Sequence, residues 1–91
     1  MDKIEAKKII NDQLARFTDH SALVPLVESR HVETLDVHGD NGTRYQVEVQ
    51  FFWDDKRKRT IRVVGSIDDG GLRAFMPLTE TALISPPENA S

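Results

Sequence analysis

Cysteine is absent from this 91-residue sequence, so the fold uses no disulfide bond, no thiolate metal site and no cysteine nucleophile. It also lacks any apolar run near the roughly 20 residues that a membrane-spanning helix needs. Residues 1–8 alternate charged and apolar side chains, whereas a secretory signal peptide has a continuous apolar segment. We therefore expect a soluble, cytoplasmic protein without a membrane association.

Positive charge is scarce overall, because the formal net charge is −3. Binding to a phosphate backbone depends on clustered Lys and Arg, so this balance disfavours nucleic acid as a partner. What is present suits a globular protein: 38% of the residues are apolar and 30% are charged. We expect one α+β domain over residues 1–85. Residues 86–91 contain no large apolar side chain and are expected to form a disordered tail.

The N-terminal segment has the apolar spacing of a helix. Between Lys3 and Phe17 the apolar residues recur at intervals that place them on one stripe: Ile4, Ala6, Ile9, Ile10, Leu14 and Phe17. The pattern predicts a helix over Lys3–Phe17 that buries Ile9, Ile10, Leu14 and Phe17. The apolar segment Ala22–Val27 contains Pro25, so we interpret it as a connector over the core, with a short helix starting at Ser21 as the alternative.

The middle of the chain alternates with a period of two, which is typical of half-buried strands. The strongest pattern predicts a central strand with Tyr45, Val47, Val49, Phe51 and Trp53 facing the core. Leu35 and Val37 mark the strand before it, and Ile61, Val63, Gly65 and Ile67 mark the strand after it. Leu72–Met76 is predicted to be the fourth strand, while Leu78–Ile84 is expected to be a short helical turn or an arm.

These elements predict an α-β-β-β-β fold, with the N-terminal helix packed on one face of a four-stranded antiparallel meander. Residues that oppose each other in an antiparallel pair share a face, which constrains the register. A three-residue loop Asp40–Gly42, with Gly42 in the left-handed conformation, pairs Val37 with Tyr45. A five-residue loop Asp54–Lys58 pairs Phe51 with Ile61, and the fourth strand then pairs Ala74 with Gly65 and Phe75 with Val64.

Side chains that often carry catalysis or bind metals have structural explanations here. The pairs Asp54-Asp55 and Asp68-Asp69 fall at predicted turns, where Asp accepts backbone hydrogen bonds. The three histidines, His20, His31 and His38, lack the spacing of a helical zinc site. Ser66 is not followed by the glycine of a nucleophile elbow. We therefore assign no catalytic residue, no metal site and no cofactor, and expect a protein that is not an enzyme.

The face of the sheet opposite the helix is the best candidate for a function. A sheet face open to water should be polar, yet the predicted register places apolar and cationic side chains together there: Phe52, Arg62, Val64, Arg73 and Phe75. We predict that this set is a partner surface, most simply for a second copy of the chain in a homodimer. Alternatively, the segment Leu78–Ile84 folds over it.

Two other functions remain open from the sequence. A small-molecule-binding protein or an enzyme with a pocket between helix and sheet would have Trp53, Tyr45 and His38 at the rim of the pocket, with Gly65 leaving room for the ligand. A weak nucleic-acid contact would use the basic loop Lys56, Arg57, Lys58 and Arg59.

Overall fold

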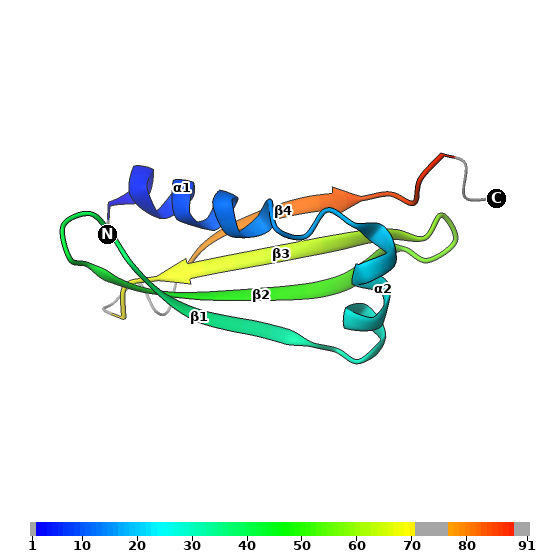
Figure 1. Ribbon diagram of the computed structural model, residues 1–91, viewed down its shortest axis with the longest axis horizontal. Helices are drawn as coiled ribbons and strands as arrows, with labels where there is room; N and C mark the ends of the chain where they lie inside the picture. Colours follow the sequence, from blue (N-terminus) through cyan, green and yellow to red (C-terminus); the bar gives the residue numbers. More distant parts are fainter. Residues whose placement is uncertain (1, 71–76, 89–91) are drawn as a thin grey trace.

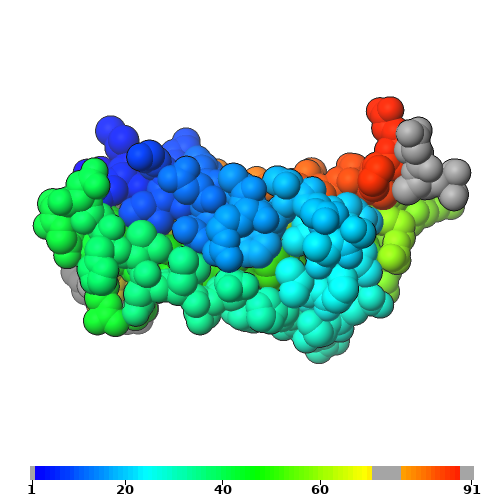
Figure 2. All heavy atoms as spheres, viewed as in Figure 1, coloured from blue at the N-terminus to red at the C-terminus, as the bar shows by residue number. Residues whose placement is uncertain are grey.

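Two helices lie on one face of a four-stranded antiparallel sheet in the computed structural model, which describes residues 2–70 and 77–88 (Figure 1). The strands neighbour each other in the order β1-β2-β3-β4, so the predicted α+β meander is confirmed. Figure 2 shows that both helices cover much of this side of the molecule. The elements are, in chain order, α1 (Lys3–Leu14), α2 (His20–Glu28), β1 (Val32–His38), β2 (Arg44–Asp55), β3 (Thr60–Asp68) and β4 (Leu78–Ile84).

Helix α1 begins at an N-cap that satisfies its first amide groups. The Asp2 carboxylate accepts hydrogen bonds from the backbone N–H groups of Ile4, at 3.1 Å, and Glu5, at 3.0 Å. The helix ends at Leu14 rather than at Phe17, although Phe17 is still buried. Ile4 is 87% exposed, so its place in the predicted apolar stripe is wrong; the buried stripe is Ala6, Ile10 and Leu14.

Helix α2 replaces the connector that the sequence predicted for Ala22–Val27. Asp19 caps its start, with the carboxylate accepting from the backbone N–H of Ser21 at 3.2 Å. Pro25 removes one helical hydrogen bond, but it lies on the exposed side while Leu23 and Val27 are buried. Burial of these two side chains in the core outweighs the local cost of proline in a helix, so the alternative interpretation, a short helix, is the correct one.

The register of β2 with β1 was predicted correctly, whereas the register of β2 with β3 was not. Val37 pairs with Tyr45 and Gly42 has a φ of 84°, as predicted for the β1–β2 hairpin. In the β2–β3 hairpin, Phe51 pairs with Val63 instead of Ile61, so the predicted register is wrong by two residues. β2 runs on to Asp55, with an irregularity between Trp53 and Asp55, and the turn lies later in the chain than expected. The shift is even, so each side chain keeps its face.

The last strand comes from a different segment than the sequence indicated. Leu78–Ile84 is strand β4, neither a helical turn nor an arm over the sheet. Gly65 therefore pairs with Glu80 instead of Ala74, and Val64 pairs with Thr81 instead of Phe75. The segment Leu72–Met76, predicted to be the fourth strand, lies outside the described residues. The period of β4 was obscured because a charged residue, Glu80, lies on its helix-facing side, where Lys7 of α1 is 3.9 Å away.

The core lies between the helices and the sheet. Tyr45, Ile61, Val63 and Ile67 are fully buried there, together with Ile10 of α1. Tyr45 also joins the helix to the sheet, because its hydroxyl donates a 2.8 Å hydrogen bond to Glu5 Oε1. Burial, and next the hydrogen bond and negative charge of Glu5, raise the pKa of Tyr45 to about 12.

Candidate functional site: the open face of the sheet

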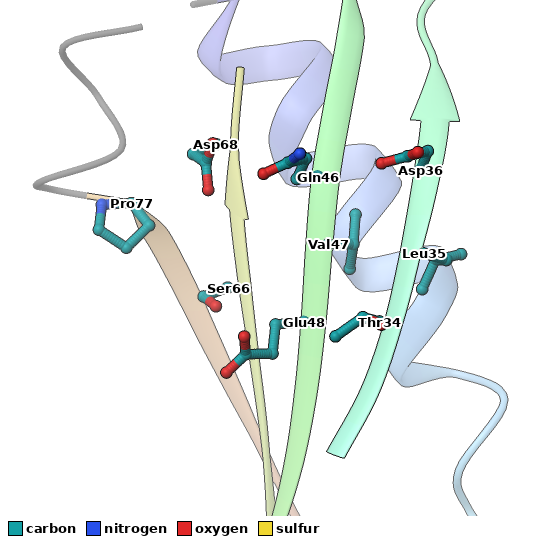
Figure 3. Close-up of a pocket in the computed structure, with 9 residues that line it drawn as sticks. All are labelled: Thr34, Leu35, Asp36, Gln46, Val47, Glu48, Ser66, Asp68 and Pro77. Atoms are coloured by element: carbon teal, nitrogen blue, oxygen red, sulfur yellow. The ribbon is translucent and has the colours of Figure 1, made fainter. Parts of the chain in front are cut away.

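The open face is the side of the sheet opposite the helices. Because side chains alternate along each strand, it carries one residue in two from every strand. Figure 3 shows part of this face, with the helix on the far side of the strands. Its residues include Val32, Thr34, Asp36 and His38 of β1; Arg44, Gln46, Glu48, Gln50 and Phe52 of β2; Arg62, Val64, Ser66 and Asp68 of β3; and Thr79, Thr81 and Leu83 of β4.

One end of this face is apolar, and we call its residues Val32, Phe52, Val64 and Leu83 the apolar end. The side chains of Val32, Phe52 and Leu83 are 44%, 42% and 58% exposed. Phe52 and Leu83 lie in one row across the sheet, on either side of Arg62. Phe52 pairs with Arg62, and Arg62 pairs with Leu83. Val64 pairs with Gln50, which in turn pairs with Val32. Large apolar side chains therefore gather over two adjacent rows of a face that neither α1 nor α2 covers.

Arg62 lies among these apolar side chains and is held in place by two of its neighbours. Its guanidinium carbon is 6.0 Å from the centre of the Phe52 ring, within the range of a cation–π contact. Its Nε atom is also 3.9 Å from Asp54 Oδ1. The combination of exposed aromatic and aliphatic groups with an Arg is characteristic of the centre of a protein–protein interface.

The opposite end of the face is polar, and we call Asp36, Glu48 and Asp68 the acidic end. Asp36, Gln46 and Asp68 form one row and Thr34, Glu48 and Ser66 the next, around a hollow of about 700 Å³ (Figure 3). Asp36 Oδ2 accepts a 2.9 Å hydrogen bond from Arg44, and Asp68 accepts one from the backbone N–H of Gly70 at 2.9 Å. Residues 2–70 and 77–88 contain no group of three side chains arranged to hold a metal ion.

The predicted basic loop forms the β2–β3 turn, and its last arginine is engaged within the protein. The Arg59 guanidinium lies 4.4 Å from the centre of the Trp53 ring. The backbone carbonyl of Arg59 accepts a 2.6 Å hydrogen bond from His20 Nε2. Asp55 accepts hydrogen bonds from the backbone N–H groups of Arg57 and Lys58, at 3.0 and 3.1 Å. The carboxylate thus shapes the turn, while the side chains of Lys56, Arg57 and Lys58 are exposed.

The predicted partner surface is brought together in part. Phe52, Arg62 and Val64 lie side by side on the open face, whereas Arg73 and Phe75 lie outside the described residues. Sequence reasoning did not include Leu83, because its segment was not recognised as a strand. The alternation of Thr79, Thr81 and Leu83 against Leu78, Glu80 and Ala82 was the available signal.

The predicted pocket between helix and sheet has no room at the position expected. A Cβ atom on Gly65 would lie 2.9 Å from Ile10 Cγ1 and 3.2 Å from Leu14 Cδ2, so side chains of α1 already fill that space. Tyr45 is fully buried, and His38 is exposed beyond the core. Trp53 is partly buried at the opposite end of β2 from Tyr45.

Comparison with known proteins gives no family and no relative: no protein-family model, no curated protein and no solved structure matches the chain. Of the helices in the described residues, none is long and apolar enough to cross a membrane. Indications of function therefore come from the surface of this fold alone.

Proposed function

We propose that the protein is a non-enzymatic interaction domain that self-associates through the apolar end of the open face. The exposure of Val32, Phe52 and Leu83 on the uncovered side of the sheet is the observation that supports this function. Burying such side chains contributes roughly 25 cal/mol for each Å² of apolar surface removed from water. A domain of this length also buries a modest share of its own surface on folding, so covering more of it adds stability.

A second copy is the simplest occupant because the apolar end can cover its own counterpart. A two-fold contact brings the same patch of both copies together, and this patch is apolar in both. The acidic end limits how far the copies overlap. Stacking Glu48 and Asp68 on their own counterparts would oppose like charges, which is unfavourable, whereas the charge of Asp36 is compensated by Arg44. The proposed contact is therefore centred on the apolar end.

Two substitutions on β4 test this proposal with a matched control. Leu83 and Thr79 lie on the same strand and face, and Thr79 is next to the acidic end. Leu83→Glu places a charge in the proposed contact and should convert a dimer to a monomer in sedimentation equilibrium. Thr79→Glu adds the same charge outside the contact centre and should leave the dimer largely intact.

Three results would contradict this function. A wild-type protein that remains monomeric at all accessible concentrations would exclude self-association. A dimer that resists Leu83→Glu would place the contact elsewhere. Equal disruption by both substitutions would indicate a general effect of charge instead of a local apolar contact.

A nucleic-acid function has weaker support. Arg59 and Arg62 are engaged with Trp53 and Phe52, and Asp54 and Asp55 lie directly beside the loop. The loop keeps its exposed positive charge, but the two carboxylates beside it weaken its attraction for phosphate groups.

A further inference from the structure

A groove of about 520 Å³ lies beside the far end of β2, apart from the acidic end of the open face. Val27 and Arg30 line it from the end of α2, and His31 and Val32 from the start of β1. Its other wall is β2 itself, from Gln50 to Trp53. A volume of this size is in the range of sites that bind small ligands or short peptide segments.

The backbone edge of β2 forms this wall. Adjacent side chains of a strand point to opposite faces, and the four consecutive residues Gln50 to Trp53 line the groove, which places the groove at the edge of β2 and not over one of its faces. β1 begins at Val32, opposite Gln50, whereas β2 continues from Phe51 to Asp55. Within the described chain, no strand pairs with β2 on this side beyond Gln50. The groove thus occupies the position that an extension of β1 would fill.

We propose that this groove binds the C-terminal segment of another polypeptide as an added β-strand, with its terminal carboxylate at Arg30. An extended peptide can pair with an exposed strand edge through main-chain hydrogen bonds, and side-chain pockets on alternate residues then give specificity. The partner is a different one from the second copy of the chain. The groove shares Val32 and Phe52 with the apolar end, so a peptide and a second copy compete for part of the same surface.

The direction of the added strand follows from the sheet. β1 is antiparallel to β2. A peptide that continues the line of β1 and also pairs with β2 in the antiparallel sense therefore runs in the same direction as β1. Its C-terminus then meets the start of β1, where Arg30 and His31 line the groove. His31 is 3.3 Å from Glu33, which leaves the exposed Arg30 as the cation for the incoming carboxylate.

The backbone of Arg30 gives independent support. Arg30 follows α2 in the left-handed conformation, with a φ of 56°, and the N–H groups of Arg30 and His31 donate to the carbonyls of Val27 and Leu26 at 3.2 and 2.9 Å. Glycine is favoured at this position of a helix end, because a Cβ atom is strained there. Strained backbone at a residue whose side chain lines a groove is consistent with a binding role for that side chain.

The side chains around the groove indicate which peptides it accepts. Phe51 and Trp53 lie on the helix-facing side of the β2 edge, and Phe52 and Val32 lie on the other side. Phe51 is only 3% exposed, and the Arg59 guanidinium lies 4.4 Å from the centre of the Trp53 ring. The accessible apolar surface for a bound strand is therefore on the side of Phe52 and Val32. We therefore expect short peptides with β-branched or aromatic residues before a free C-terminal carboxylate, and no requirement for a basic residue.

A library of random short peptides displayed with free C-termini provides the probe. Selected sequences are then synthesised as the free acid, as the C-terminal amide, and as free acids N-methylated at alternate residues. We expect the acid to bind, the amide to bind about tenfold more weakly through loss of a charge-assisted contact, and N-methylation on one set of alternate residues to abolish binding. No selected sequence, or equal affinity of the acid and all other forms, would overturn the proposal.

The Arg30→Gly substitution tests the protein side of the contact without harming the fold. Glycine relieves the left-handed backbone, so the melting temperature should be unchanged or higher while peptide affinity falls about tenfold. Arg30→Lys keeps a charge but loses the paired donors, and should give an intermediate affinity. Leu83→Glu, which tests self-association, should retain peptide binding. The Arg30 variants are compared in the Leu83→Glu background, where a second copy does not compete for Val32 and Phe52. Undiminished affinity of Arg30→Gly there would refute the assignment of the carboxylate.

Discussion

Tyr45 and Glu5 form a contact that fixes the N-terminal helix on the first hairpin. Glu5 Oε1 accepts from the Tyr45 hydroxyl, and Glu5 Oε2 accepts from the backbone N–H of Asp40 at 2.9 Å. Gly39 gives the carboxylate its space, because a Cβ atom there would overlap it. One carboxylate therefore connects α1 both to the core and to the β1–β2 turn.

This contact predicts a stability change at high pH. The pKa of Tyr45 is raised from 10.0 to about 12 in the folded protein, so folding opposes loss of its proton. Ionisation of Tyr45 therefore leaves the free energy of unfolding unchanged below about pH 10 and lowers it as the pH rises toward 12. In urea denaturation at a series of pH values, wild type should exceed Tyr45→Phe in stability by about 1–2 kcal/mol near neutral pH. The difference should narrow above pH 10; a constant difference would contradict the mechanism.

Residues whose role depends on the local pattern alone were predicted well from the sequence. Asp55 and Asp68 accept backbone hydrogen bonds at turns, and Gly42 adopts a positive φ, as their chemistry indicates. Arg30 could not be identified in this way. Its proposed role depends on a left-handed conformation and on a strand end that becomes its neighbour only in the folded protein.

At the scale of elements, the contact between α1 and β3 sets how closely the helix approaches the sheet. Gly65 lies in the middle of β3, and Ile10 and Leu14 pack directly over it. The glycine is required here by the close approach of two side chains, not by its backbone angles.

Gly65→Ala should therefore destabilise the protein by about 1–3 kcal/mol, because the added methyl group lies too close to Ile10. Ile10→Ala removes both Cγ1 and Cδ1, which would lie 2.9 and 3.1 Å from that methyl group, so the double variant should lose less than the sum of the two single losses. Chemical denaturation measures all three variants. Ser66→Ala, on the opposite face of the same strand, is the control and should cost less. Strictly additive losses would show that the two positions do not interact.

The type of an element could be predicted where its periodic pattern was long. The prediction failed where another interaction competed with the pattern. β2 was identified because five core positions alternate without interruption. α2 was predicted only as the alternative to a connector, because Pro25 was taken as a breaker, although Asp19 and the burial of Leu23 and Val27 stabilise the helix. The β2–β3 register was wrong because Asp54 and Asp55 favour turns; in the structure Asp54 stays in the strand, near Arg62.

The whole molecule is long and narrow, with dimensions of 47 × 21 × 16 Å. Its radius of gyration of 14.3 Å exceeds the roughly 12 Å expected for a compact domain of this length. The elongated shape follows from the length of the β2–β3 hairpin, which extends past β1 at one end (Figure 1). The same shape separates the apolar end from the acidic end, so that one face carries two surfaces of different chemistry.

Self-association at the apolar end predicts a melting temperature that depends on protein concentration. A partner that binds the folded state stabilises it by mass action. For a domain of this size the wild type should gain about 3–5 °C for each tenfold rise in concentration above the dissociation constant. Leu83→Glu should melt at one temperature throughout, and Thr79→Glu should behave as wild type. A concentration-independent transition in all three would indicate that the monomer is the stable unit.

The narrow shape also determines how the molecule rotates in solution. α1 lies roughly along the long axis (Figure 1), so its N–H bonds point along that axis, while those of the strands point across it. The N–H bonds of α1 are thus reoriented only by slow end-over-end tumbling, whereas those of β2 and β3 are also reoriented by faster spinning about the long axis. A single rotational correlation time does not describe this protein.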